Sequence, residues 1–366
     1  MNPPQLVKNL GAVGVPLLGV VALALGWNVK DPGVVVVVLM AVVLAATVLA
    51  AVHHAEVIAH KVGEPFGSLV LAVAVTVIEV ALIITLVISG GPETASLARD
   101  TVFAAVMITT NGIIGLCLLV GALRHGLIRF NAEGAGALLA TVTTLAVLCF
   151  VLPTFTTGPA AQFSTSQLVF VAIVSLALYA LFVTTQTLKH RDFFLPVSVD
   201  GQKIRTDDDH ASAPTTRATM LSLGMLLLAL VAVVGLAKLV SPSIEAGVAA
   251  VGFPNSFVGV VIALLVLLPE SIAAVRAARR NRIQTSINLG LGSAMASIGL
   301  TIPAIAVASF FLPGPLLLGL GPTQIVLLVL TVLVSILTIA PGRATRLQGG
   351  VHLAIFAAFV FLSIAP

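Results

Sequence analysis

Long apolar segments separated by short polar stretches repeat along almost all of the 366 residues. Each is about 18–25 residues long, the length that a helix needs to cross a hydrocarbon core of roughly 30 Å. The segments are apolar on all sides instead of striped, as expected of helices in lipid. The pattern predicts an all-α polytopic membrane protein with eleven transmembrane helices, near residues 11–29, 33–53, 65–90, 101–123, 134–153, 166–188, 218–240, 255–275, 284–311, 323–341 and 348–365.

Composition and charge support this prediction and orient the chain. Hydrophobic residues make up 59% of the sequence and charged residues 9%, against roughly 25% charged in soluble domains. With the N-terminus in the cytoplasm, fifteen of the 18 Lys and Arg residues lie on the cytoplasmic side, and only Lys30, Arg99 and Lys238 lie outside. We therefore expect a protein of the cytoplasmic (inner) membrane with an external C-terminus, and attribute its net charge of +4 to the loops and not to nucleic-acid binding.

An internal similarity divides the chain into two halves. "FGSLVLAVAVTVIE" at 66–79 aligns with "FVGVVIALLVLLPE" at 257–270, with five of fourteen positions identical. The following spans share an Asn followed by two glycines, in "TTNGIIGL" and "SINLGLGS". Because five spans separate the equivalent helices, the halves have opposite orientation, as in many secondary transporters. The predicted parts are an extra N-terminal helix, a first five-helix repeat, a cytoplasmic polar linker and a second five-helix repeat, at 1–30, 31–188, 189–217 and 218–366.

Glu79 and Glu270 end the aligned segments, and each lies inside an apolar span. An acid within the membrane costs on the order of 2.5–3.5 kcal/mol and typically marks an ion or proton pathway. One carboxylate from each repeat suits a hard cation such as calcium, which takes about six to eight oxygen ligands. The same two groups can carry protons instead. The alternative is that each acid only holds helices together or lies in a water-filled vestibule.

Neighbouring residues offer further oxygen ligands. Asn111 and Asn288 have side-chain oxygens, although hydrogen bonding between helices alone is the alternative for both. Pro269 has no N–H, so the carbonyl of Leu265 loses its helical partner and is a candidate ligand. The first repeat has Ile78 in place of this proline, and there the hydroxyl of Thr76 is the candidate.

Other polar residues have two interpretations each. Glu64 precedes a proline at the predicted cytoplasmic start of a span, where it either opens the helix or serves as a gate or proton-entry group. His352 is expected to be a satisfied interfacial histidine. The linker is expected to be solvated, with a regulatory cation site as the alternative; the acidic cluster that would form it is Asp207, Asp208 and Asp209 with His210.

Four segments resemble the calcium/cation antiporter superfamily, in particular its bacterial ChaA-type calcium/proton antiporters. They are "HKVGEPFGSLVLAVAVTVIEVALI", "TTNGIIGLCLLVGALRHG", "LLVLLPESIAAVRAARRN" and "INLGLGSAMASIGLTIP". The resemblance implies two inverted five-helix repeats, alternating access and proton-coupled cation export. It also implies ion-binding roles for Glu79 and Glu270, and members of this branch also handle sodium or potassium.

The combined prediction is a secondary active transporter that exchanges cytoplasmic Ca²⁺ for external H⁺. Its partners are inorganic cations, protons and the lipid bilayer, with no cofactor and no nucleic acid. The alternatives are a Na⁺/H⁺ or K⁺/H⁺ antiporter on the same fold, or a cation channel. We do not expect an enzyme, because "HHAEVIAH" lacks the HExxH motif of zinc proteases.

Overall fold

The structure is a computed structural model that describes residues 3–29, 33–63, 66–90, 95–156, 161–195, 214–311 and 315–366. These residues form helices joined by short loops, together with one pair of two-residue strands. The expectation of an all-helical fold is therefore confirmed for the described chain. The helices group into two compact units, which are described separately.

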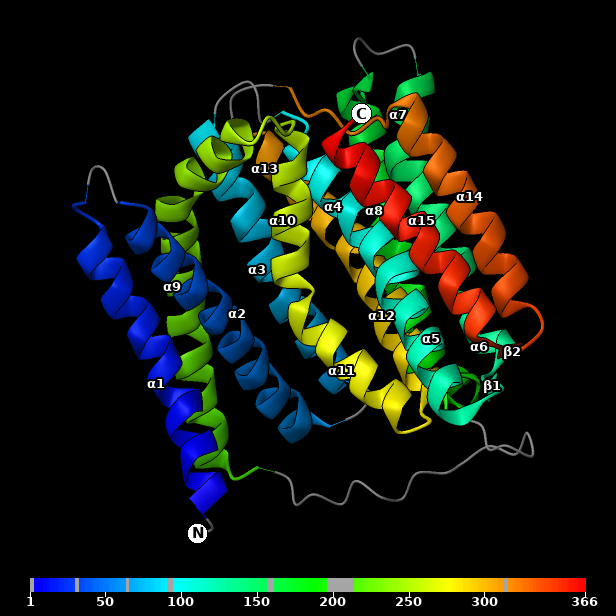
Figure 1. Cartoon of the computed structure of the whole chain (residues 1–366), viewed down its shortest axis with the longest axis horizontal. Coiled ribbons are helices and arrows are strands. Elements are labelled where there is room, and N and C mark those ends of the chain that lie inside the picture. The colour runs from blue at the N-terminus through cyan, green and yellow to red at the C-terminus, as the bar shows by residue number, and fades with distance from the viewer. Residues whose placement is uncertain are drawn as a thin grey trace. The chain divides into compact units, whose positions relative to one another are not determined.

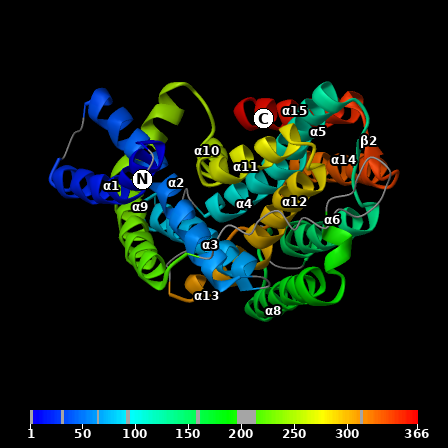
Figure 2. The same ribbon diagram turned by 90° about the horizontal axis from the view of Figure 1, so that it is seen from below.

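Unit 1 contains three N-terminal helices and one helix from the second half of the chain. Helix α2 packs against the other three, and α1 and α3 also pack against α9 (Figures 1 and 2). A Cβ on Gly19 of α1 would meet Thr47 Oγ1 of α2 at 2.7 Å and Ala232 Cβ of α9 at 3.1 Å, so the absence of a side chain lets these helices pack closely. The helices are α1 (Pro3–Gly26), α2 (Val34–Val62), α3 (Phe66–Gly90) and α9 (Thr216–Ala250).

Unit 2 contains the remaining helices. Its most deeply buried span is a continuous helical segment formed by α4, η2 and α5. This segment packs against α10, α11, α12 and α15. Segments η2, η3 and η5 are π-helical and η6 is a 3₁₀-helix. The elements are α4 (Leu97–Met107), η2 (Ile108–Ile113), α5 (Ile114–His125), α6 (Ala132–Ala146), η3 (Val147–Val151), α7 (Leu152–Phe155), α8 (Thr165–Thr184), η5 (Thr185–Lys189), η6 (Arg191–Phe194), α10 (Ser256–Val266), α11 (Leu268–Arg279), α12 (Ile283–Gly299), α13 (Thr301–Ser309), α14 (Pro322–Ile339) and α15 (Arg346–Ile364).

Local sequence explains where several helices begin. Ser164 and Gln167 form a capping box at the start of α8, in which each side chain bonds the other residue's backbone N–H. Asn131 Oδ1 accepts from the backbone N–H of Glu133 at 2.9 Å and so caps α6. The short strands β1 (Ile128–Arg129) and β2 (Arg343–Ala344) are antiparallel and join the α5–α6 loop to the α14–α15 loop.

The length and composition of the helices confirm a multi-pass membrane protein. Within the described residues, two predicted spans contain shorter apolar helical stretches, Val13–Gly26 and Val70–Thr85, so the count of eleven stays a prediction. A further span is formed by α10 and α11 together, which meet at a bend of 53°. Eight helices are long and apolar enough to cross a bilayer: Val34–Val62, Leu97–His125, Ala132–Phe155, Thr165–Lys189, Thr216–Ala250, Ile283–Ser309, Pro322–Ile339 and Arg346–Ile364.

The two compact units do not follow the predicted repeats. Unit 1 combines the extra N-terminal helix with α2 and α3 of the first predicted repeat and α9 of the second. The helices α2 and α9, which are the first of each predicted repeat, pack directly against each other. The boundaries of the repeats themselves stay a prediction.

Candidate cation-binding site

Glu79 lies within α3 of unit 1, a helix without a break. Its side chain is 2% exposed. Thr76 is three residues earlier and 7% exposed, and residues at this spacing share one face of a helix. Unit 1 therefore places a buried carboxylate and a buried hydroxyl on the same face of one apolar helix.

Glu270 lies in the first turn of α11, directly after the bend between α10 and α11. The bend has an identifiable cause, because Pro269 has no N–H to donate to the carbonyl of Leu265 and a proline ring breaks a helix at this point. The Glu270 side chain is half-buried. Its position at a helix N-terminus is favourable for a carboxylate, because the aligned peptide dipoles place positive partial charge there.

Asn111 is fully buried in the π-helix η2 of unit 2, and its amide bonds residues of two other helices. Its Nδ2 donates to Thr331 Oγ1 of α14 at 2.9 Å. Its Oδ1 lies 3.1 Å from Nδ1 of His352 on α15. His352 is 1% exposed, and its Nε2 lies 3.1 Å from Thr338 Oγ1, so both ring nitrogens have hydrogen-bond partners, as expected of a satisfied histidine. Of the two interpretations of Asn111, hydrogen bonding between helices is thus observed, and ligation of an ion stays a prediction.

Asn288 has both ends of its amide engaged within unit 2. Its Oδ1 accepts from Gln284 Nε2 at 2.9 Å, and its Nδ2 donates to the backbone carbonyl of Phe194 at 2.7 Å. Gln284 is 1% exposed, and its Oε1 accepts from the backbone N–H of Asn131. Asn288 therefore fixes α12 to the segment that begins the predicted linker, and its ligation of an ion stays a prediction.

The glycines beside the two asparagines differ in what they contact. A Cβ on Gly115 would meet His352 Cβ at 2.9 Å, and a Cβ on Gly290 would meet Ile114 Cγ1 at 2.9 Å. Both glycines therefore allow close helix packing. A Cβ on Gly112 would be in ordinary contact with a phenylalanine ring, and one on Gly292 would meet nothing within 4 Å.

The six predicted ligands are divided between the two units, so their convergence on one ion stays a prediction. Glu79 and Thr76 belong to unit 1, and the other four belong to unit 2. Glu64 and the acidic cluster at 207–210 lie outside the described residues. Among the side chains that the structure describes, no group of three or more His, Cys, Asp or Glu residues could hold a metal ion.

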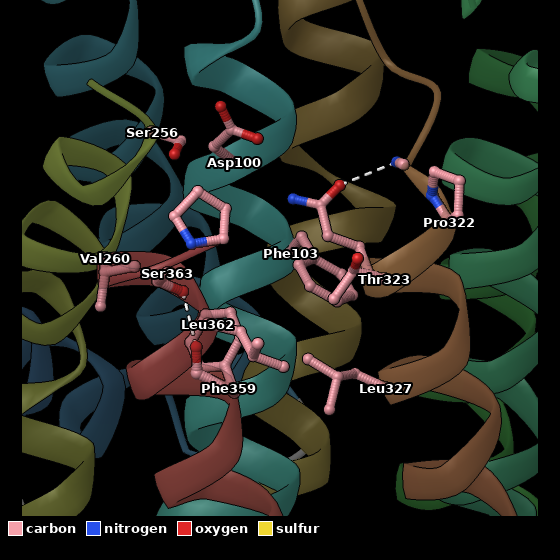
Figure 3. Close-up of a pocket in the computed structure, with 13 residues that line it drawn as sticks. Asp100, Phe103, Ser256, Val260, Pro322, Thr323, Leu327, Phe359, Leu362 and Ser363 are labelled. Carbon is pink, nitrogen blue, oxygen red and sulfur yellow. Dashed lines mark hydrogen bonds between the residues drawn. The ribbon is translucent and has the colours of Figure 1, made fainter. Parts of the chain in front are cut away.

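A pocket of about 220 Å³ in unit 2 contains an acid that the sequence analysis overlooked. Asp100 in the first turn of α4 lines it together with residues of α10, α14 and α15 (Figure 3). Its side chain is almost fully buried and is held by Arg99 at 2.8 Å and by Ser96 Oγ at 2.8 Å. Arg99 also donates to the carbonyl of Gly319 at 2.8 Å. In the sequence, Asp100 stands out only as one of two adjacent opposite charges at the edge of an apolar run.

Because its charge is matched by Arg99, we expect Asp100 to stabilise unit 2. Asp100→Asn removes the carboxylate from two charge-assisted hydrogen bonds, each worth about 1.5–3 kcal/mol. The apparent unfolding temperature in detergent should fall. Glu133→Gln is the control, because Glu133 is exposed and also lies in the first turn of a helix. Equal unfolding temperatures for the two variants would contradict this role.

The fold and the site define a class of protein. A multi-pass helical membrane protein that buries carboxylates and amides within its spans is typical of proteins that move ions. The sequence pattern of the family described as sodium/calcium exchanger protein matches residues 32–188 and 221–365. The chain belongs to this family.

Individual relatives agree with this assignment. The chain is 47% identical to the protein y4hA of Sinorhizobium fredii over 96% of its own length and 95% of the relative. It is 33% identical to the sodium-potassium/proton antiporter ChaA of Escherichia coli, over 96% and 95% of the two chains. The solved structure of native YfkE has a TM-score of 0.73 at 18% identity and covers 96% of this chain and 99% of its own, which shows a shared fold. The expected ChaA-type resemblance is confirmed.

Proposed function

We propose that this protein is a cation/proton antiporter of the cytoplasmic membrane that exchanges cytoplasmic Ca²⁺ for external H⁺ by alternating access. The observation that carries the proposal is Glu270, a half-buried carboxylate in the first turn of a helix that follows a 53° break within an apolar span. Broken helices of this kind form ion sites in secondary transporters, because they free backbone groups at membrane depth.

The exchange chemistry follows from using the same carboxylates for both cargoes. Deprotonated Glu79 and Glu270 supply the negative charge that a divalent cation needs, with further oxygens from Thr76, the Leu265 carbonyl and Asn111. A carboxyl group that accepts a proton loses this charge and releases the cation. Cation and protons therefore occupy the site in turn, and no separate proton carrier is required.

The layout of the chain supports alternating access. The two separate matches to one family pattern support two related halves. With the N-terminus in the cytoplasm and eleven spans, these halves are inverted relative to each other, and a site at their interface can open first to one side and then to the other. In this proposal Asn288 orients α12 through its hydrogen bonds to Gln284 and to the carbonyl of Phe194.

Sodium or potassium in exchange for protons is the second candidate. It is favoured by one relative, the sodium-potassium/proton antiporter ChaA of Escherichia coli, which is similar over 96% of this chain. The same carboxylates would bind a monovalent cation, which brings only one positive charge to the site. The two candidates therefore differ in cargo and not in mechanism.

Everted membrane vesicles acidified by respiration and loaded with a pH-sensitive dye distinguish these candidates. We expect CaCl₂ to discharge the proton gradient in vesicles that contain the protein, and not in vesicles from the same strain without it. A response to NaCl or KCl alone would favour the second candidate. No response to any of the three salts would overturn the proposal, and an ionic current without proton movement would indicate a channel.

A further inference from the structure

His352 connects three helices of unit 2 through a buried chain of hydrogen bonds. It lies on α15 and is 1% exposed. Its Nδ1 faces Asn111 Oδ1 of η2, and its Nε2 faces Thr338 Oγ1 of α14, both at 3.1 Å. From the sequence His352 was expected to be a satisfied interfacial histidine, and the function proposed above does not use it.

Two glycines bring His352 to Asn111. Gly115 is four residues after Asn111, and Gly349 is three residues before His352, so each lies on the same helix face as its polar neighbour. A Cβ on Gly349 would meet Leu119 N at 2.5 Å and Gly115 O at 2.8 Å, both backbone atoms of α5. The backbones of α5 and α15 therefore touch at this point, which brings the imidazole within hydrogen-bond distance of Asn111.

Helix α14 presents a matching stripe of hydroxyl groups. Thr331, Ser335 and Thr338 are spaced four and three residues apart, which places them on one face of the helix. They are 2%, 3% and 4% exposed. Thr331 and Thr338 bond Asn111 and His352 respectively, while Ser335 between them takes no part in the chain of hydrogen bonds.

With the Asn111 amide oriented as the structure has it, the hydrogen bonds of this chain have one consistent set of directions. Asn111 Oδ1 only accepts, so His352 Nδ1 carries the hydrogen. In a neutral imidazole the other nitrogen then accepts, and the hydroxyl of Thr338 donates to it. At the far end, Asn111 Nδ2 donates to Thr331. The Asn111 amide is therefore held at both ends, with one lone pair of Oδ1 occupied and its amino group turned toward α14.

We propose that His352 is a positioning residue that sets cation affinity by fixing the orientation of the Asn111 amide. This inference rests on the proposed function, in which Asn111 supplies an oxygen to the cation. An amide that rotates would present its N–H groups in place of the oxygen, and N–H groups repel a cation. Thr338 bonds the other nitrogen of His352 and so holds the imidazole ring in place, and Thr331 holds the amino end of the amide.

The test measures proton release from proteoliposomes of the full-length protein while CaCl₂, NaCl and KCl are each titrated. We expect His352→Leu to raise the half-saturating cation concentration about tenfold and leave the maximal rate within about twofold, since it removes about one net hydrogen bond from the ordered state. His352→Asn keeps an N–H donor near the position of Nδ1, so its half-saturating cation concentration should lie within about threefold of that of the wild type. Thr338→Val and Thr331→Val should each raise the half-saturating cation concentration about threefold.

Ser335→Ala is the matched control, because Ser335 is buried on the same stripe of α14 and its hydroxyl is outside the hydrogen-bond chain. Its half-saturating concentration should equal that of the wild type. If His352→Leu does not fold, the two threonine variants decide. Three results would overturn the inference. The half-saturating concentration could be unchanged in the threonine variants, it could rise equally in His352→Leu and His352→Asn, or the maximal rate alone could fall. A wild type that exchanges none of the three cations would overturn the proposed function instead.

Discussion

Glu270→Gln is expected to abolish cation-dependent proton release from everted vesicles while the protein remains in the membrane. Glutamine keeps the size and the hydrogen-bonding capacity of the side chain but loses the negative charge and the exchangeable proton. Because the proposed site has only two carboxylates to balance a divalent cation, we expect the loss of one to lower the affinity by about a hundredfold or more. We expect the same result for Glu79→Gln, because the proposed site needs one carboxylate from each repeat.

Glu133→Gln provides the control for both variants. Glu133 lies in the first turn of α6 as Glu270 lies in the first turn of α11, but its side chain is exposed. Its replacement should leave proton release unchanged. If Glu270→Gln or Glu79→Gln keeps full activity at equal amounts of protein in the membrane, that glutamate is not part of the transport site.

The helices and the helix break could be predicted because their causes are local. Apolar runs long enough to span a bilayer are visible in the sequence, and each of the predicted spans contains helix in the described residues. Pro269 acts on the residues immediately around it, so the broken helix at Leu265 and Glu270 follows from a single position. In the first repeat Ile78 stands at the equivalent place, and α3 is correspondingly unbroken.

The partners of Asn111 could not be predicted in the same way. Thr331 is 220 residues and His352 is 241 residues away in the sequence, so their hydrogen bonds depend on how α14 and α15 pack against η2. The π-helix that holds Asn111 also has no distinct sequence pattern. The glycines in "TTNGIIGL" allow a close approach, yet they give no indication of which helix packs there.

Asp100 was missed for a related reason. Its position next to Arg99 at the edge of a span is typical of a solvated interfacial pair, and the structure instead buries the carboxylate in the wall of a pocket. The segment that closes over this pair comes from a distant part of the chain, where Gly319 accepts a hydrogen bond from Arg99. Burial of a charged residue thus depends on packing that the local sequence does not reveal.

Gly349→Ala is expected to destabilise unit 2 strongly, because the added methyl group meets backbone and not flexible side chains. Its Cβ would lie 2.5 Å from Leu119 N and 2.8 Å from both Gly115 O and Leu119 Cα, so α15 must move away from α5. Overpacking of this kind costs about 1–3 kcal/mol or more. The separation would also lengthen the contact between His352 and Asn111, so proton release should decrease together with the apparent unfolding temperature.

Gly350→Ala is a closely matched control for this prediction. Gly350 is the next residue of the same helix, and a Cβ there would meet nothing within 4 Å. Alanine is favoured over glycine in a helix by up to about 1 kcal/mol, so this variant should unfold at the same or a higher temperature and keep full exchange activity. Similar unfolding temperatures for the two variants would show that α5 and α15 are not in backbone contact, and the positioning role of His352 would then lose its structural basis.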